Sequence, residues 1–510
     1  MAAPFALIPG QLVLGQMRGL GEGPEVALDP ACYDVVDKAS TAVNAIVAGE
    51  ARVYGVNTGV GSLAKETISA DTASEMQRRL IVSHSAGVGP LLGDATVRRA
   101  MIMKINVLAL GYSGMRRDVI DALLTLYNAD VLPCIPSKGS VGASGDLAPL
   151  AHMALILLGV GDARSGGETI TAAEGLVRAG LQPTVFGAKE ALCMLNGTQI
   201  SASLALDGLF GAENVFAAAV VAGSLSIDAT FGSDVPFDAR INEIRRQQGQ
   251  IDIAATYRGL LSTSEIRDSH VNCERVQDPY SLRCQPQIMG ACLDHLRFAA
   301  TIFGRELNAV TDNPLMFVDS GEVLSGGNFH AEPLAMAADT LALAIAETGA
   351  LSERRIALMN DENFSQLPPF LVAEPGLNSG FMEAQVVAAA LTSENKALAH
   401  PSSVDSLPTS ANQEDHVSMA TYAARRLSDM ADNAAAIVAI ELLAAAQGIE
   451  FRRPLTSLDV LEEAHAIIRS KVPALDQDRF FAPDIEAIKA LVVAGAFNHM
   501  MPPGILPSLS

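Results

Sequence analysis

Apolar residues recur at helical spacing through the larger, C-terminal part of the chain. Residues 147–159 (LAPLAHMALILLG) predict a buried helix that stops at a glycine. Three longer stretches, 333–359, 380–400 and 420–447, continue the same period. Gly448 follows the last of them as a candidate C-cap. At 1.5 Å per residue this last helix would be roughly 40 Å long.

The first 110 residues follow a different pattern. Short segments alternate with glycine-rich loops such as 21–24 (GEGP) and 54–64 (YGVNTGVGSLA), which break regular structure. Few runs alternate in the manner of strands. We therefore predict a mainly α fold with two domains, an irregular N-terminal domain over 1–110 and a central bundle of long helices over 111–510.

Composition and charge narrow the class of protein. Of 510 residues, 49% are apolar and 18% are charged, which indicates helices buried on most sides or a large subunit interface. The net charge of -22 argues against a nucleic-acid partner, which needs a basic face. No run reaches about 18 uninterrupted apolar residues, so we expect no membrane helix.

The cysteines and the N-terminus indicate the compartment. The six cysteines form no CxxC pair, and free thiols in a reducing cytoplasm are the better interpretation. The N-terminus lacks a basic start, and Pro4 and Pro9 interrupt its apolar run, so it is not a signal peptide. We expect a cytoplasmic protein.

The segment 139–152 (GSVGASGDLAPLAH) places a loop of small residues directly before a helix. A phosphate-binding loop would need a lysine after the glycines, and Asp146 stands there instead. The spacing is not that of a dinucleotide turn, and Asp146 also replaces the second glycine of a nucleophile elbow. On spacing alone, the simplest interpretation is a tight turn with Asp146 as the N-cap of the helix.

A second chemistry fits the same loop. If Ala143, Ser144 and Gly145 fold tightly, the amide nitrogen of Gly145 can attack the carbonyl carbon of Ala143. Glycine suits this step because its nitrogen is unhindered and its backbone reaches unusual angles. Loss of two waters, one of them from the serine hydroxyl, gives a methylidene-imidazolone ring, an electrophile that no ordinary side chain provides.

This loop resembles the cofactor-forming segment of the aromatic amino acid ammonia-lyases, and the resemblance extends over nearly the whole chain. It implies a fold of the fumarase/aspartase-like superfamily and a 4-methylidene-imidazol-5-one (MIO) group formed autocatalytically from Ala143, Ser144 and Gly145. It also implies a homotetramer whose active sites draw residues from three subunits. The further matching motifs are 54–59 (YGVNTG), 83–89 (SHSAGVG), 195–199 (LNGTQ), 276–287 (VQDPYSLRCQPQ), 311–314 (TDNP), 325–333 (SGGNFHAEP) and 406–419 (SLPTSANQEDHVSM).

The resemblance assigns the steps of the reaction to particular residues. Tyr54 matches the tyrosine of a mobile lid loop in the N-terminal domain and would remove the β-proton of the substrate. Arg283 matches the residue that holds the substrate carboxylate, for which a guanidinium fork is suited. Tyr280, a further catalytic candidate, and Gln277 share its segment and would bound the pocket. Ammonia and an α,β-unsaturated acid would be the products.

Three further residues match pocket positions of the family. Asn196 would contact the ring and the substrate carboxylate, and Asn313 and Phe329 would complete the wall. The alternative for each asparagine is a role in a turn or a cap.

His84 and Glu414 indicate the substrate. The resemblance is to the histidine-specific pattern at both positions, and a carboxylate pairs with an imidazole but would be poorly paired against a phenyl ring. We therefore expect deamination of L-histidine to trans-urocanate. Two departures, Val60 in the lid loop and Glu383, leave selectivity open. The alternatives are a same-fold lyase acting on a histidine betaine such as ergothioneine or on L-tyrosine, an MIO aminomutase, or a non-catalytic helical scaffold.

Three histidines raise the question of a metal. His330, His400 and His416 are far apart in the sequence and in no ligand-spaced cluster. We expect capping or core roles for them and no metal.

Overall fold

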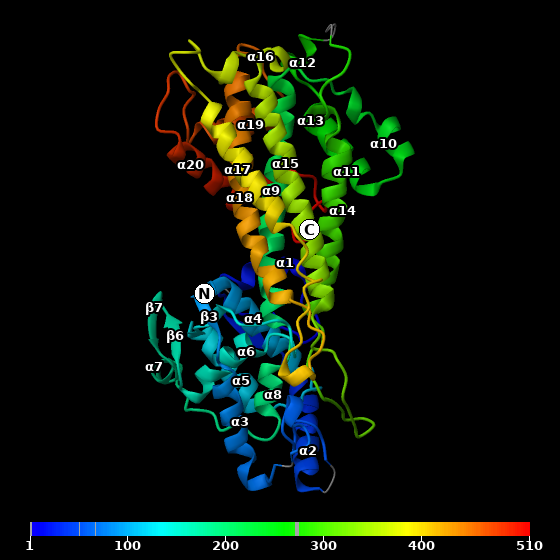
Figure 1. Cartoon of the computed structure of the whole chain (residues 1–510), viewed down its shortest axis with the longest axis vertical. Coiled ribbons are helices and arrows are strands. Elements are labelled where there is room, and N and C mark those ends of the chain that lie inside the picture. The colour runs from blue at the N-terminus through cyan, green and yellow to red at the C-terminus, as the bar shows by residue number, and fades with distance from the viewer. Residues whose placement is uncertain (1–2, 50–51, 67, 271–274, 510) are drawn as a thin grey trace. The chain divides into compact units, whose positions relative to one another are not determined.

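The computed structural model describes residues 3–49, 52–66, 68–270 and 275–509. Within these residues the chain is built mainly from α-helices (Figure 1), which confirms the predicted mainly α class. Its contacts divide the chain into two units, each assembled from three separate stretches of sequence. Cys273 lies outside the described residues, and the other five cysteines are free thiols.

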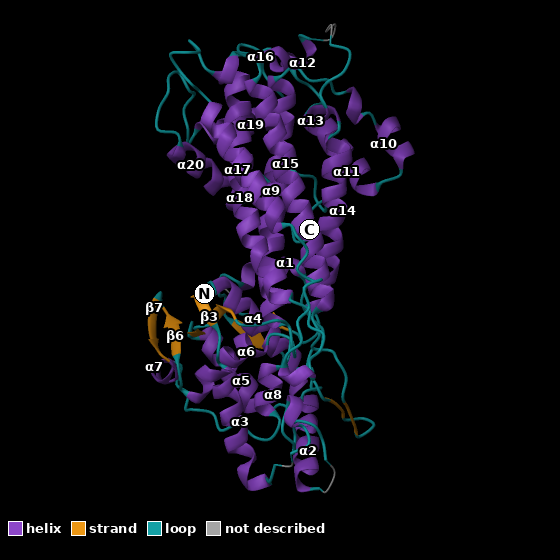
Figure 2. Ribbon diagram, in the orientation of Figure 1, coloured by secondary structure: helices purple, strands orange, loops and turns teal. Residues whose placement is uncertain are grey.

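The first unit comprises Met1–Asp207, Ala300–Ala338 and Pro401–Arg425. Every strand among the described residues belongs to it (Figure 2). Its elements in chain order are β1 (Phe5–Leu7), α1 (Leu14–Leu20), β2 (Val26–Leu28), α2 (Tyr33–Ala48), α3 (Ala70–His84), β3 (Val88–Leu91), α4 (Asp94–Leu108), α5 (Arg117–Asn128), β4 (Leu132–Pro133), β5 (Pro136–Lys138), α6 (Leu147–Leu155), β6 (Asp162–Ser165), β7 (Glu168–Thr171), α7 (Ala172–Arg178), α8 (Glu190–Leu195), β8 (Leu315–Phe317) and β9 (Glu322–Leu324).

Short strands in the first unit form small separate sheets. β1 and β2 pair in parallel, whereas β3–β5, β4–β6–β7 and β8–β9 are antiparallel. The core of the unit is helical, because α4 is buried along nearly its whole length. That helix carries polar residues such as Lys104 and Asn106 into the interior, where they need polar partners.

The second unit comprises Gly208–Ala299, Asp339–His400 and Arg426–Ser510. Four long helices contain a residue at which the sequence passes from one unit to the other: α9 (Gln199–Ala229), α14 (Gln285–Glu306), α15 (Glu332–Asn360) and α18 (Ala420–Glu450). The helices lying wholly in the second unit are α10 (Ala239–Arg245), α11 (Gln248–Leu260), α12 (Glu265–Asp268), α13 (Tyr280–Arg283), α16 (Glu362–Ser365), α17 (Met382–Leu398), α19 (Asp459–Arg469) and α20 (Ala482–Val493).

The long helices occur where the apolar pattern predicts them. The stretches 333–359 and 380–400 are α15 and α17. The helix predicted over 147–159 is α6 followed by a 3₁₀ turn, and it stops at Gly159, whose φ of 70° is left-handed. The early part of the chain combines its glycine-rich loops with the helices α2, α3 and α4.

One predicted helix end is wrong. α18 does not stop at Gly448 but continues to Glu450. A Cβ added to Gly448 would lie 2.8 Å from the Cβ of Ala229, which is closer than two carbon atoms can pack. The glycine therefore permits close helix packing within the second unit.

Three helices, α9, α15 and α18, are long and apolar enough to cross a membrane by length and composition alone. Their most apolar windows are 89%, 72% and 89% buried inside the protein. Burial therefore accounts for their hydrophobicity, and the absence of a membrane helix stays a prediction.

The two units do not follow a single cut in the sequence. The first unit takes residues from three separate stretches of the chain. A single boundary near residue 110 divides the sequence, whereas the contacts divide the folded chain. The division into domains 1–110 and 111–510 stays a prediction.

Candidate active site

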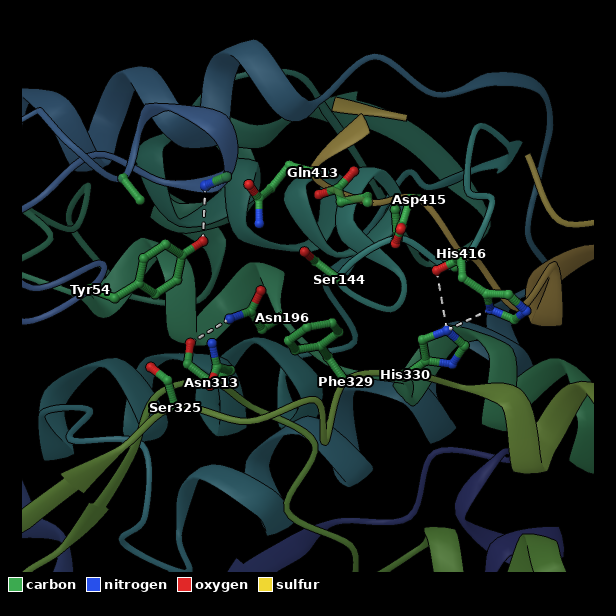
Figure 3. A pocket seen from close by; sticks show the side chains of 15 residues that line it. Tyr54, Ser144, Asn196, Asn313, Ser325, Phe329, His330, Gln413, Asp415 and His416 are labelled. Carbon is green, nitrogen blue, oxygen red and sulfur yellow. Dashed lines mark hydrogen bonds between the residues drawn. The ribbon is translucent and has the colours of Figure 1, made fainter. Parts of the chain in front are cut away.

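The first unit contains a pocket with a volume of about 430 Å³ (Figure 3). Its wall is made by loops that are distant in the sequence, and seven of the residues predicted for the site take part. The described residues that line it are Tyr54, Gly61, Ala64, Gly142, Ala143, Ser144, Asn196, Asn313, Ser325, Phe329, His330, Gln413, Glu414, Asp415 and His416.

The loop of small residues folds back on itself at the pocket. Ser144 has a φ of 56°, between Gly142 at 85° and Gly145 at 73°. A residue with a side chain adopts this left-handed region at a cost of about 1–2 kcal/mol. The amide of Gly145 donates to the carbonyl of Gly142 at 3.3 Å. This tight reversal is compatible with cyclisation of the loop.

Neighbouring backbone surrounds the loop closely. A Cβ on Gly145 would lie 2.1 Å from the carbonyl oxygen of Gly197, so only glycine fits there. The amide of Asp146 donates to that same Gly197 oxygen at 2.7 Å, and the amide of Met419 donates to Val141 at 2.9 Å. Segments that are distant in the sequence thus hold the loop from both sides.

Asp146 anchors the loop through its side chain. The carboxylate is fully buried and accepts hydrogen bonds from the Ser201 amide at 2.7 Å, the Ser201 hydroxyl, and the Thr421 hydroxyl at 3.1 Å. Burial raises the pKa of Asp146, and these donors oppose that rise. Asp146 occupies the N-cap position of α6, but its side chain makes no capping bond there. The predicted N-cap position is therefore confirmed, but the side chain serves the loop and not the helix end.

Tyr54 lies across the pocket from this loop (Figure 3). Its hydroxyl oxygen accepts a hydrogen bond from the Gly61 amide at 2.9 Å. Gly55, with a φ of 67°, lets the backbone approach α8, since a Cβ there would lie 2.3 Å from a methyl carbon of Leu192. Contacts within its own loop thus position the phenol group.

A buried polar network stands behind Asn196. Its side-chain amide donates to Asp312 at 3.1 Å and to the carbonyl of Asn313 at 2.8 Å. The backbone carbonyl of Asn196 accepts a hydrogen bond from the Lys104 ammonium at 2.6 Å. The Lys189 ammonium forms an ion pair with Asp312 at 2.6 Å. These bonds fix which way the Asn196 amide faces in the pocket wall.

Burial and neighbouring charges shift the pKa values of the ionisable groups in this network. Burial lowers the pKa of Lys104 to about 8, although Asp312 opposes the change. Burial alone would raise the pKa of Asp312, but Lys189 and Lys104 outweigh it and hold that pKa below its ordinary value. Two ammonium groups therefore share one carboxylate behind the pocket.

We expect the free energy of unfolding to rise with pH, relative to a Lys104→Met variant, between pH 8 and 10. The folded chain holds the pKa of Lys104 at about 8 instead of the ordinary 10.5. The unfolded chain therefore binds more protons in this interval, and stability increases by up to about 1.4 kcal/mol per pH unit. Urea unfolding of both proteins at pH 7.5, 8.5 and 9.5 measures the difference. A constant or falling difference would contradict it.

The remaining predicted residues in the pocket are held by local contacts. Glu414 is half-buried, and its carboxylate accepts from the Thr409 hydroxyl at 2.8 Å. The side-chain oxygen of Asn313 accepts from the Gly326 amide at 2.7 Å. Asn196 and Asn313 do take part in hydrogen bonds with backbone, as their alternative interpretation requires, but they also line the pocket.

His84 is in the first unit but is not among the residues that line the pocket. It is the last residue of α3, and its Nδ1 lies 2.8 Å from the carbonyl oxygen of Leu80. Since a carbonyl only accepts, this contact places a proton on Nδ1.

Three of the predicted residues belong to the second unit. Gln277 lines a separate cavity of about 350 Å³ there. The side chain of Tyr280 is 69% exposed. The guanidinium carbon of Arg283 lies 4.5 Å from the centroid of the Tyr280 ring. The Arg283 Nε donates to the carbonyl of Asp278 at 3.0 Å. Among the described residues of a single chain, these three do not line the first pocket.

Some pocket residues were missed at the level of sequence. Gln413 and Asp415 flank Glu414, and Ser325 begins the segment that carries Phe329. All three lie inside motifs that the resemblance covers. Their place in the same motif as a named residue was the signal that could have identified them.

The expectation for two histidines is corrected. His330 and His416 line the pocket instead of serving as core or capping residues. Although they are distant in the sequence, their Nε2 and Nδ1 atoms are 3.4 Å apart (Figure 3). With Glu332 they form a group with metal-ligand spacing, contrary to the expectation that no such cluster exists. His400 belongs to the second unit.

The two departures from the family pattern lie outside the pocket wall. Val60 is half-buried beside Gly61 but does not line the cavity. Glu383 is exposed in the first turn of α17, in the second unit. Neither side chain lines the pocket of the single chain.

The residues present fit an MIO group. The backbone at Ser144 and Gly145 is already left-handed, the space beside Gly145 admits no Cβ, and Ala143 and Ser144 form part of the pocket wall. These three residues would form the group within the loop.

Comparisons with known proteins identify the family. A model of the family described as aromatic amino acid lyase matches residues 12–470. The chain is 57% identical to a histidine ammonia-lyase of Desulfotalea psychrophila over 100% of both chains. It is 59% identical to one of Rhodospirillum rubrum over 98% of each. The chain belongs to the aromatic amino acid lyase family.

Solved structures share the fold. A histidine ammonia-lyase from Trypanosoma cruzi, 36% identical, has a TM-score of 0.89 and covers 98% of this chain and 97% of its own. A tyrosine aminomutase from Streptomyces globisporus, 33% identical, has a TM-score of 0.92 over 98% of each chain. The predicted fold class, a bundle of long helices of the fumarase/aspartase-like superfamily, is confirmed, and the protein is a carbon–nitrogen lyase.

Proposed function

We propose that the protein deaminates L-histidine non-oxidatively to trans-urocanate and ammonia. The observation that carries the proposal is that Ser144 of the small loop and the carboxylate of Glu414 line one cavity. The first supplies the reaction type and the second a partner for an imidazole ring. The identity to relatives named histidine ammonia-lyase, over the full length, supports the same substrate.

We propose that Ala143, Ser144 and Gly145 form MIO autocatalytically. Once formed, the group supplies an electrophilic methylene carbon at the pocket wall. The chain's own contribution would be to hold the loop folded back, through Gly197 and Asp146, which favours the approach of the reacting backbone atoms.

Tyr54 would take the β-proton of the substrate. Its hydroxyl oxygen lies in the pocket and already accepts one hydrogen bond, from the Gly61 amide at 2.9 Å. That N–H remains a donor when the oxygen is negatively charged, as it is in a base. Asn196, with its amide fixed by Asp312 and Asn313, would orient the carboxylate region of the substrate.

Glu414 would bind the imidazole of the substrate, with His84 as a second contact. Replacing Glu414 with Gln is expected to lower kcat/KM for L-histidine by about 10–100-fold, because a charged hydrogen bond contributes about 1.5–3 kcal/mol. Steady-state kinetics measures the change. Asp415→Asn, which neutralises the neighbouring carboxylate, is the matched control and should lose less. Equal losses in both variants would contradict a specific role of Glu414.

Absorbance of urocanate tests the overall proposal. Purified protein incubated with L-histidine should accumulate urocanate and release one ammonia for each molecule formed. L-tyrosine, L-phenylalanine and ergothioneine serve as competing substrates in parallel. An absence of urocanate from a chain whose mass has fallen by two waters would overturn the substrate assignment but leave the ring in place.

The two alternative reactions give different products. A lyase acting on ergothioneine would release trimethylamine, and its quaternary amine cannot add to an electrophile, so the retained Ala143–Ser144–Gly145 segment argues against it. An MIO aminomutase would give a β-amino acid. Chromatography of the products distinguishes all three.

We propose a homotetramer whose active sites are shared between subunits. Tyr280, Arg283 and Gln277 do not line the pocket of their own chain's first unit, so they would complete the pocket of another subunit. Apolar side chains on the long helices support an interface: Phe298, Leu343 and Val386 are 51%, 52% and 50% exposed.

Mixed oligomers test the sharing. Ser144→Ala and Arg283→Met chains should each be nearly inactive alone at low histidine concentration. When co-expressed, they should recover part of the wild-type activity, because some sites combine an intact loop with an intact Arg283. The control is Ser144→Ala mixed with Tyr54→Phe, whose residues line one chain's pocket and should not complement. Mixed oligomers without recovery would contradict shared sites.

Localisation and partners follow only from composition. A cytoplasmic location, the absence of nucleic-acid and membrane partners, and an amino acid as the small-molecule substrate fit the proposal. The free thiols at the described cysteines agree with a reducing compartment.

A further inference from the structure

Two histidines that line the pocket form a cluster with the nearby Glu332 that the proposed reaction does not use. His330 precedes α15, Glu332 begins α15, and His416 lies in the loop before α18. One nitrogen or oxygen atom from each lies within 4.8 Å of the others. Figure 3 shows the two histidines together, on the opposite side of the view from Tyr54.

The spacing of the two imidazoles is that of ligands on one ion. Nε2 of His330 and Nδ1 of His416 are 3.4 Å apart, which exceeds the usual N–H hydrogen-bond length of about 2.9–3.0 Å. Two nitrogens bound to one tetrahedral ion, each about 2.0–2.1 Å from it, lie about 3.3–3.4 Å apart. The two nitrogens therefore already lie at the separation that a shared tetrahedral ion requires.

His330 can present the required lone pair. Its Nε2 also lies 3.3 Å from the carbonyl oxygen of His416, which only a protonated nitrogen would engage. A neutral imidazole can carry its proton on either nitrogen. With the proton on Nδ1, the Nε2 atom of His330 becomes a ligand.

Glu332 supplies an independent observation. Its Oε2 atom is buried, and no described residue donates a hydrogen bond to it. A buried acceptor without a donor costs about 1–3 kcal/mol, and more when it is charged. A cation would satisfy this oxygen, and the flexible glutamate side chain can close the remaining distance to the two nitrogens.

We propose that His330, Glu332 and His416 bind one divalent transition-metal ion, of which Zn²⁺ is the representative, at the wall of the pocket. Two imidazoles and one carboxylate suit zinc, cobalt or nickel better than magnesium or calcium, which prefer oxygen ligands. Three protein ligands leave one tetrahedral position open. Since both histidines line the pocket, water or another small donor molecule can occupy that position.

Metal titration of the purified full-length protein tests the site, and its outcome does not depend on the substrate. Chelator-treated, dialysed protein is titrated with Zn²⁺ against a chromophoric chelator, and one ion per chain should bind saturably. Co²⁺ should give the visible absorption bands of a four-coordinate site, and Zn²⁺ should remove them. Binding without a fixed stoichiometry, or no binding, would overturn the proposal.

Variants locate the site on these residues. His330→Ala, His416→Ala and Glu332→Gln should each weaken Zn²⁺ binding by at least about tenfold, because even the loss of a residue that only orients a ligand costs 10–100-fold. The control His295→Ala removes an exposed imidazole on α14 and should leave the affinity unchanged. If the histidine variants fail to fold, judged by circular dichroism, Glu332→Gln and the Co²⁺ spectrum decide. Wild-type affinity in Glu332→Gln, or an equal loss in His295→Ala, would overturn the proposal.

Discussion

A Ser144→Ala variant should fold and assemble but lose turnover of L-histidine by at least about a thousandfold. The serine hydroxyl is the only group in the Ala143–Ser144–Gly145 segment whose elimination leaves an exocyclic methylene. The substitution removes that hydroxyl and little else, because the side chain lies in the open pocket wall. The anchors of the loop, Asp146 and Gly197, remain in place. Ammonia release under saturating L-histidine measures the loss.

Intact mass shows whether the loss has the expected cause. The mass of the wild-type chain should be lower than its sequence predicts by two water molecules. Ser144→Ala cannot lose the water that comes from the serine hydroxyl, so its mass deficit should be smaller. Ser325→Ala, another serine of the pocket wall, is the control and should keep the wild-type mass deficit. Full activity in Ser144→Ala, or in a wild-type chain of unmodified mass, would rule out the loop as the source of the electrophile.

Tyr54→Phe should lower kcat by about 10²–10⁴-fold with a much smaller effect on KM. The phenol oxygen is the proposed base, and general-base catalysis contributes a factor of this size. Phenylalanine keeps the ring that fills the pocket wall and removes only the oxygen that accepts from the Gly61 amide. Steady-state kinetics separates the two constants.

Two observations keep the Tyr54 result interpretable. The variant should show the full loss of two waters, because the tyrosine takes no part in ring closure. Tyr112→Phe, which alters a partly exposed tyrosine packed on Phe317 outside the pocket, should retain activity. A Tyr54→Phe enzyme with near wild-type kcat would assign proton removal to another group.

Local pattern predicted the helices well, and distant packing explains the errors. The stretches 333–359 and 380–400 are helical because their own apolar spacing requires a buried face. Gly448 has the chemistry of a helix end, but its role depends on Ala229, which is 219 residues earlier in the chain. Asp146 has the chemistry of an N-cap, but its partners Ser201 and Thr421 come from other elements. No local rule contains those partners.

Some residues of the site could be predicted from the sequence, and others could not. The resemblance named Tyr54, Asn196 and Glu414, which the structure brings into one pocket. It gave no sign that Lys104 and Lys189 stand behind Asn196, because neither belongs to a quoted motif.

The histidine cluster was invisible from spacing. His330 and His416 are 86 residues apart, and metal sites are recognised in sequences only when their ligands recur at short intervals. Arg283 and Tyr280 are a third case, because their proposed partners lie on another subunit. The sequence of one chain does not show which residues of two subunits lie close together.

The anchors of the small loop have a consequence for the order of events during synthesis. Residues 139–146 leave the ribosome early, but Met419 and Thr421, which hold Val141 and Asp146, emerge only in the last fifth of the 510-residue chain. A nascent chain ending before them lacks one side of the clamp. Under the proposed ring formation, the loop would therefore cyclise only after these late residues have been made, and an incomplete chain would carry no electrophile.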